Sequence, residues 1–122
     1  MSTIHRFTGE QTDCTWEKVP VYKYGDEFKG VTRQIIIGPD DHAPNFAIRY
    51  FRVEPGKHTS LDQHPHEHGV VIVHGRARLQ INHDFYELGP MDAVFISGND
   101  VHQFTALGDE PLGFFCTVPA NR

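Results

Sequence analysis

The sequence predicts an all-β fold, a sandwich or barrel built from short antiparallel strands. Eleven glycines and eight prolines are spread along the 122 residues, and they leave no window long enough for a good helix. The segments between them are rich in β-branched and aromatic residues, which favour strands. No helical segment separates these strands, so a parallel sheet with crossover helices is excluded.

Eight segments carry the strand pattern. In chain order they are Val31–Ile37, Asn45–Val53, Val70–His74, Arg76–Ile81, Asp84–Leu88, Ala93–Ile96, Val101–Thr105 and Leu112–Val118. In Arg76–Ile81 the apolar and polar residues alternate, which predicts a half-buried antiparallel strand. The Asn-His-Asp sequence at 82–84 predicts a hairpin turn between two of the strands. Glycine and proline predict further turns at residues 38–42, 54–56, 89–90 and 108–111.

Residues 1–30 are less regular and are expected to form an N-terminal arm. Within them, Trp16–Tyr24 could supply an edge strand or pack on a neighbouring copy, and Pro20 argues against a central strand. Residues 31–119 are expected to form the main body. A chain of 122 residues fits one domain and leaves little room for a second.

The charge pattern of the chain limits the kinds of molecule that it is expected to bind. The chain has 11 basic and 16 acidic side chains, a net charge of −5, and its lysines and arginines are scattered. This argues against nucleic acid or an anionic membrane as the main partner. The aliphatic run Val70–Val73 is far too short to span a bilayer, and the first six residues lack the apolar stretch of a secretory signal. We therefore expect a cytoplasmic protein.

The two cysteines, Cys14 and Cys116, are isolated in the sequence, so neither a zinc ribbon nor a C-x-x-C redox motif is present. In a reducing cytosol both are expected to be free thiols.

Histidine is the unusual residue in this composition. Of nine histidines, five fall within seventeen residues: His58, His64, His66, His68 and His74. Asp62 and His64 are two apart and face the same side of an extended strand. Pro65 and Gly69 favour a turn before the strand that begins near His68, so ligands from two segments can converge. Imidazole nitrogen and carboxylate oxygen suit a divalent transition metal, and His102 on a later strand could add a further ligand.

Residues 56–75 resemble the first motif of the cupin family, G-x5-H-x-H-x3-E-x6-G, with every interval in register. Asp62 stands where the motif has its first histidine, and His68 stands where it has glutamate. The second motif, G-x5-P-x-G-x2-H-x3-N, is matched more loosely around His102. The resemblance covers roughly residues 31 to 119. It implies a small single-domain cupin, an antiparallel β-barrel or jelly-roll-like double sheet.

The resemblance also implies a mononuclear metal site with Asp62, His64, His68 and His102 as ligands. One divalent transition metal is expected, whether manganese, iron, nickel, cobalt or zinc. Four protein ligands on an octahedral ion leave two positions for water, O₂ or substrate. Aspartate is shorter than histidine, so Asp62 could instead bind through a water or only orient His64. The turn at Pro65 is expected to direct His66 toward the rim of the pocket or the solvent.

Two further residues are pocket candidates. Phe104 shares its strand face with His102. Cys116 lies in the last apolar strand, where a small buried apolar residue is expected first, although the resemblance also allows a cysteine near the metal. Arg49 and Arg52 have opposite parity, so at most one faces the cavity, where it would bind an anionic substrate. His58 and His74 are expected at the surface or at a strand edge.

For function, the resemblance implies a metal-dependent enzyme acting on a small oxygenated molecule. Dioxygenase-type cleavage of a carbon–carbon bond is slightly favoured over a redox-neutral isomerase or lyase reaction on a sugar acid. A non-catalytic binding or sensor protein is the third hypothesis, because one fold hosts many functions. The expected partners are a small-molecule substrate and, by family analogy, a second copy of the chain in a homodimer.

Overall fold

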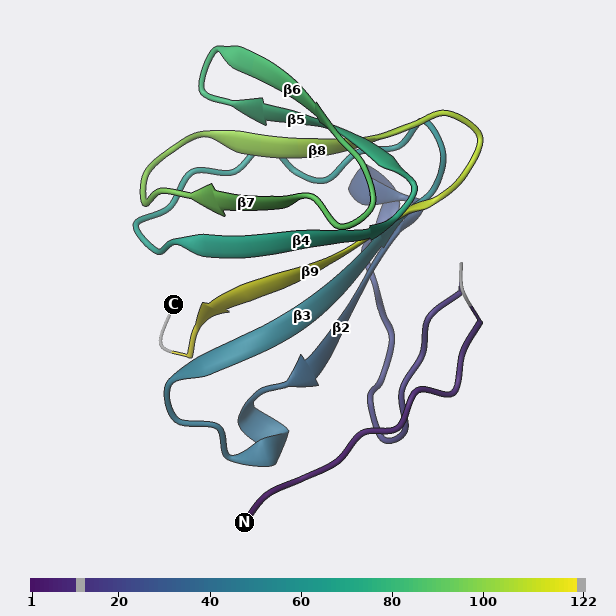
Figure 1. Ribbon diagram of the computed structural model, residues 1–122, viewed down its shortest axis with the longest axis vertical. Helices are drawn as coiled ribbons and strands as arrows, with labels where there is room; N and C mark the ends of the chain where they lie inside the picture. The colour runs from purple at the N-terminus through teal and green to yellow at the C-terminus, as the bar shows by residue number, and fades with distance from the viewer. Residues whose placement is uncertain (11–12, 121–122) are drawn as a thin grey trace.

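A computed structural model describes residues 1–10 and 13–120, and these form two antiparallel β-sheets (Figure 1). The described part contains no α-helix, only the 3₁₀ turns η1 (Asp26–Phe28) and η2 (Pro39–Asp41). The strands are β1 (Tyr22–Lys23), β2 (Val31–Ile37), β3 (Phe46–Val53), β4 (His68–His74), β5 (Arg76–Ile81), β6 (Asp84–Leu88), β7 (Ala93–Ile96), β8 (His102–Leu107) and β9 (Leu112–Pro119). The predicted all-β class is confirmed.

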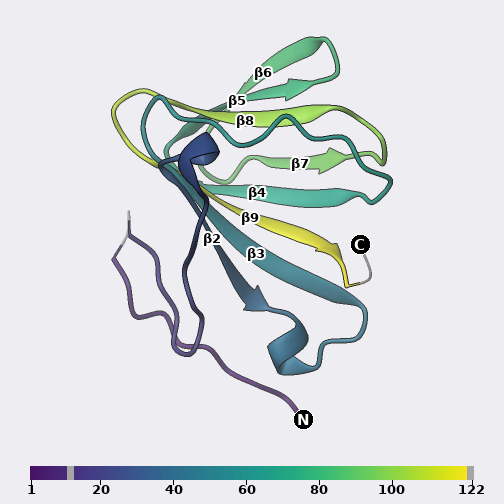
Figure 2. The same cartoon turned by 180° about the vertical axis from the view of Figure 1, so that it is seen from behind.

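The larger sheet has the order β1-β2-β3-β9-β4-β7, and the smaller has the order β6-β5-β8. The two views of the chain show the small sheet lying above the large one (Figures 1 and 2). Residues 57–62 run along the free side of β8. Thr59 N donates to Phe104 O, and Asp62 and His102 exchange both of their backbone hydrogen bonds. The histidine-rich loop is therefore tied at its start to the strand that carries His102.

Most strand boundaries fall within one residue of where the sequence predicts them, and two strands extend two residues further. Strand β4 begins at His68 rather than Val70, because His68 and Gly69 already pair with Ile96 and Phe95 of β7. Strand β8 continues to Leu107 rather than Thr105, because Ala106 and Leu107 pair with the start of β5. In both cases pairing with a neighbour decides where the strand ends.

The core lies between the two sheets and follows the alternation seen in the sequence. On β5, Ala77 and Leu79 are buried while Arg76 and Arg78 are exposed. On the large sheet the buried residues include Val53, Ile72 and Phe114.

The N-terminal segment packs on the outer face of the large sheet, where Figure 2 shows it lying outside β2. The Trp16 ring meets the Tyr50 ring edge-on at 5.2 Å and lies 6.0 Å from the Phe115 ring. Gln34 Nε2 donates a 2.8 Å hydrogen bond to the backbone oxygen of Cys14. Residues 22–23 add the short edge strand β1. The segment thus supplies both an edge strand and a cover for the chain's own sheet. Cys14 and Cys116 are both buried, and they are not joined in a disulfide.

A buried polar pair joins β3 to the end of β4. Tyr50 Oη donates to His74 Nε2 at 2.6 Å, and His74 Nδ1 donates to Pro111 O at 3.0 Å. Burial raises the pKa of Tyr50, so its hydroxyl stays protonated. The expectation that His74 lies at the surface or a strand edge is wrong at this point: the side chain is 7% exposed. Gly113 faces the pair from β9, and its lack of a side chain makes the room that the pair occupies.

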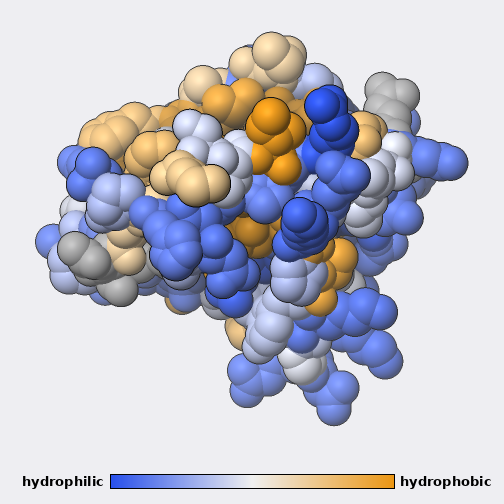
Figure 3. All heavy atoms as spheres, turned by 90° about the horizontal axis from the view of Figure 1, so that it is seen from below, coloured by the Kyte–Doolittle hydropathy of each residue, from blue (hydrophilic) through white to orange (hydrophobic). Residues whose placement is uncertain are grey.

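Seen from below, the molecule is covered mainly by hydrophilic side chains, with apolar ones gathered in places among them (Figure 3). Among the residues described, no helix has both the length and the apolar character needed to cross a membrane.

Candidate functional site

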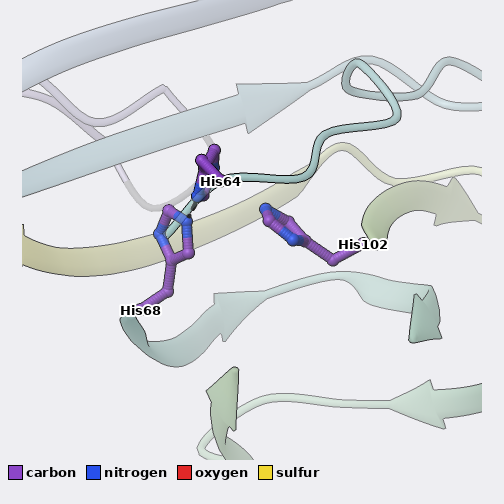
Figure 4. A group of neighbouring side chains, drawn as sticks. All are labelled: His64, His68 and His102. Atoms are coloured by element: carbon purple, nitrogen blue, oxygen red, sulfur yellow. Dashed lines mark hydrogen bonds between the residues drawn. The ribbon is translucent and has the colours of Figure 1, made fainter. Parts of the chain in front are cut away.

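Three histidines from separate chain segments meet at one end of the space between the sheets. His64 lies in the loop before β4, His68 is the first residue of β4, and His102 is the first residue of β8. One ring nitrogen of each lies within 4.8 Å of the others, and His64 Nε2 and His68 Nε2 are 3.2 Å apart. Figure 4 shows the three rings turned toward one another.

Strand alternation places two of these rings. His68 shares the inner face of β4 with the buried Val70, and His102 shares the inner face of β8 with the buried Phe104. Each is less than a tenth exposed.

A backbone clamp places the third ring. Asn99 N donates a 2.7 Å hydrogen bond to His64 O, and a Cβ on Gly98 would lie only 2.3 Å from Pro65 O. Glycine at position 98 therefore allows the turn before β8 to pack directly on the loop that carries His64.

The donor set fits a divalent transition metal. His102 Nδ1 donates to the Asp100 carbonyl at 2.9 Å, so in the neutral ring Nε2 presents a lone pair. His68 Nδ1 lies 3.0 Å from Cys116 Sγ, and when it donates to the sulfur its Nε2 presents a lone pair as well. His64 Nδ1 is buried without a hydrogen-bond partner among the residues described. Converging neutral imidazoles suit manganese, iron, nickel, cobalt or zinc. The His64, His68 and His102 triad could hold such an ion.

The electrostatics of the site keep His68 neutral. Burial, and after it the nearby ionisable groups His102, Arg49, His64 and His66, together lower the pKa of His68 to about 3. A neutral imidazole is the form that can bind a metal.

This pKa predicts a pH dependence for the metal-free protein. The unfolded chain takes up the His68 proton near the ordinary pKa of 6.5, whereas the folded chain takes it up only near 3. The free energy of unfolding should therefore fall as the pH drops from about 6.5 toward 3. Urea unfolding of the wild type and His68→Gln across this range measures it, and the variant should show the smaller decline. Parallel declines would contradict the assignment.

Asp62, the fourth ligand implied by the sequence, lies outside the group of three. Its side chain is exposed, and its carboxylate accepts a 2.7 Å hydrogen bond from Ser60 Oγ. Its backbone bonds to His102 hold it beside the triad, at the edge of the same cavity.

His66 does not point away from the site as expected. Its ring stacks on that of His64, with the centroids 3.8 Å apart and the planes 7° from parallel, and it lines the cavity. The chain does bend at Pro65 and His66, but the bend leaves the His66 ring stacked on that of His64.

The triad lies in the wall of a cavity of about 360 Å³, a size suited to a small molecule. Both pocket candidates from the sequence, Phe104 and Cys116, line it. The Phe104 ring stacks on Phe114 at 4.4 Å, and Phe114 stacks on Phe51 at 5.2 Å. One wall of the cavity is therefore aromatic and apolar, while the triad forms a polar end.

Of the two arginines weighed in the sequence, Arg49 faces the cavity and Arg52 lies on the other face of β3, paired with Glu54. A second arginine, Arg33, also lines the cavity and was missed. Arg33 of β2 pairs with Phe51 of β3, and paired residues lie on the same face of a sheet. This pairing would have placed Arg33 in the cavity, but the register of the two strands is known only from the structure.

Comparison with known proteins gives consistent matches. The model of the cupin domain family matches residues 49–118. A curated relative from Rhodospirillum rubrum, 1-methylthio-D-xylulose 5-phosphate methylsulfurylase, is 38% identical over 116 residues, which cover 92% of this chain and 73% of the relative.

Solved structures resemble the chain over nearly its whole length. A cupin-2 domain from Rhodospirillum rubrum is 38% identical with a TM-score of 0.84, covering 95% of this chain and 79% of the other. A cupin 2 conserved barrel domain protein from Rhodopseudomonas palustris is 30% identical with a TM-score of 0.85, covering 98% and 82%. The polyketide cyclase RemF from Streptomyces resistomycificus, 24% identical, covers 98% of this chain and 80% of the other with a TM-score of 0.79 and shares the fold.

Proposed function

Since the chain belongs to the cupin domain family, we propose that it is a metal-dependent enzyme that converts a small oxygenated substrate. The observation that carries the proposal is the convergence of His64, His68 and His102 at the polar end of a cavity of about 360 Å³. A closed structural metal site has no need of such a cavity.

A divalent metal bound by the triad would act as a Lewis acid toward a carbonyl or hydroxyl oxygen of the substrate. The chain's own residues would prepare the site. Asp100 and Cys116 orient the His102 and His68 rings through their Nδ1 atoms. The aromatic wall formed by Phe51, Phe104 and Phe114 would exclude water from the bound molecule.

The curated relative directs the choice of reaction. Its name describes action on a methylthio sugar phosphate, and this supports a phosphorylated sugar as the substrate. We propose a reaction on that sugar that does not consume O₂. We propose 1-methylthio-D-xylulose 5-phosphate as the first substrate to test. Dioxygenase chemistry is the second candidate, because three protein ligands on an octahedral ion leave positions for both O₂ and a substrate.

The experiment is an assay with defined metal and defined oxygen. The protein is purified without a histidine tag and reconstituted with Mn²⁺, Fe²⁺ or Zn²⁺. The loss of 1-methylthio-D-xylulose 5-phosphate is then followed by ³¹P NMR under argon and in air. Dithiothreitol keeps Cys116 reduced. We expect turnover under argon that disappears after chelation of the metal. Turnover only with Fe²⁺ in air would contradict the first proposal and support the dioxygenase, and no consumption in either gas would contradict this substrate.

A further inference from the structure

Two positively charged side chains line the cavity, and neither forms an ion pair with a carboxylate in the part of the chain that the structure describes. Arg49 on β3 is 9% exposed, and Arg33 on β2 is half-buried. In both, the Nε atom is buried and has no hydrogen-bond partner among the described residues. Across residues 1–10 and 13–120, the carboxylates that pair with arginine are Glu54 and Glu87, and these hold Arg52 and Arg76 instead.

The sheet register brings the two side chains to the same region. Arg33 pairs with Phe51, and Arg49 pairs with Ile35, so the two arginines are diagonal neighbours on β2 and β3. Diagonal neighbours on one face of a sheet are within reach of long side chains. The two guanidinium groups can therefore approach one ligand from the same wall.

Aromatic rings hold these groups in position without neutralising them. The Arg49 guanidinium lies 5.1 Å from the centre of the Phe51 ring, and that of Arg33 lies 4.9 Å from the centre of Tyr22. Arginine cannot lose its proton in a protein, so its charge persists when it is buried. A buried charge without a partner is unfavourable, and a bound anion would compensate for it.

The anion position adjoins the triad. Arg49 Nη2 donates to Cys116 Sγ at 3.4 Å, and the same sulfur lies 3.0 Å from His68 Nδ1. One side chain thus separates the arginines from the histidines, so a small molecule can reach both.

We propose that Arg33 and Arg49 form a subsite that binds a phosphate monoester group of the substrate. This inference rests on the proposed function, in which the reacting end of the same substrate lies at the triad. Two guanidinium groups match the charge of a phosphate monoester, which is about −1.5 to −2 at neutral pH, better than the single charge of a carboxylate. Their planar forks of N–H donors also suit phosphate oxygens. Asp62, which is exposed and also lines the cavity, accepts a hydrogen bond from Ser60 Oγ and pairs through its backbone with His102 of β8.

The test measures anion binding in protein dialysed against a chelator, so that the triad holds no metal. Wild type, Arg33→Gln and Arg49→Gln are titrated with inorganic phosphate and, separately, with glycerol 3-phosphate and with acetate, by isothermal calorimetry. Both variants should bind the two phosphates at least about 10-fold more weakly, the loss expected when one charge-assisted contact is removed. Arg52→Gln, on the opposite face of β3, is the matched control and should bind like the wild type.

Two results would overturn the subsite. If both variants bind phosphate as tightly as the wild type, the two arginines do not bind the anion. If the wild type binds acetate as tightly as phosphate, the subsite does not select a phosphate. If Arg49→Gln fails to fold, the half-buried Arg33→Gln carries the test alone. Metal content is measured on the same variants after reconstitution. A triad that binds no metal would leave phosphate binding intact, so failure of the proposed function and failure of the subsite are distinguishable.

Discussion

The His102→Ala variant should lose its metal while keeping its fold. Removing one of the three converging imidazoles leaves only those of His64 and His68, which are four positions apart in the sequence. Changes to groups that merely orient metal ligands weaken metal binding roughly 10–100-fold, so loss of a ligand should weaken it by at least about 100-fold. Turnover in the assay described above should fall with it. Metal content by mass spectrometry, after equilibration in a metal buffer, measures the effect.

The fold should survive because the strand pairing of His102 is made by its backbone, and the one side-chain hydrogen bond lost is that from Nδ1 to the Asp100 carbonyl. Its N–H and C=O groups bond to Asp62, and alanine keeps both. The matched control is His83→Ala, an exposed histidine in the turn between β5 and β6, which should retain the full metal content. Circular dichroism checks the fold of both variants. A His102→Ala protein that binds one metal per chain as tightly as the wild type would refute the triad.

The Gly113→Ala variant should be strongly destabilised. A Cβ at this position would lie 2.2 Å from Tyr50 Oη and 2.3 Å from His74 Nε2, far inside contact distance. Both side chains are buried and bonded to each other, so they cannot move without losing that hydrogen bond. Overpacking a core and leaving buried polar groups unsatisfied each cost roughly 1–3 kcal/mol, so we expect a loss of about 2–4 kcal/mol.

Urea unfolding measures this loss. Gly89→Ala is the control, because nothing lies within 4 Å of the position of its added Cβ, and its stability should change by no more than about 0.5 kcal/mol. In a double variant, Tyr50→Phe removes one of the clashing atoms. Its cost combined with Gly113→Ala should therefore be smaller than the sum of the single costs. Equal stability of Gly113→Ala and the wild type would show that the pair can move at little cost.

The strands were predictable because each depends on local alternation and on turns. The pattern of Arg76–Ile81 gives the buried positions of β5 directly. The three histidines were predictable for a similar reason, since motif spacing and strand parity both place His68 and His102 on inner faces. What the sequence indicates well is the side of a strand on which a residue lies.

The direction in which a short or loop-borne side chain turns is harder to predict. Asp62 has the right parity, but its carboxylate meets Ser60 at the exposed edge of the cavity. His66 stacks on its neighbour His64 instead of turning outward. The positions of the Arg33 and His74 side chains depend on partners far away in the sequence, Phe51 and Tyr50 respectively. No local sequence pattern predicts such partners.

The contact of Gly98 and Asn99 with the His64 loop couples the positions of two histidines of the triad. The tetrapeptide 97–100 leads directly into His102, and it also fixes the backbone oxygen of His64. A lengthened or shortened tetrapeptide would displace the rings of His64 and His102 at the same time, whereas His68, the first residue of β4, would stay in place. The distance between the His64 and His102 rings and the His68 ring is thus set by one short connection that is not part of the cavity lining.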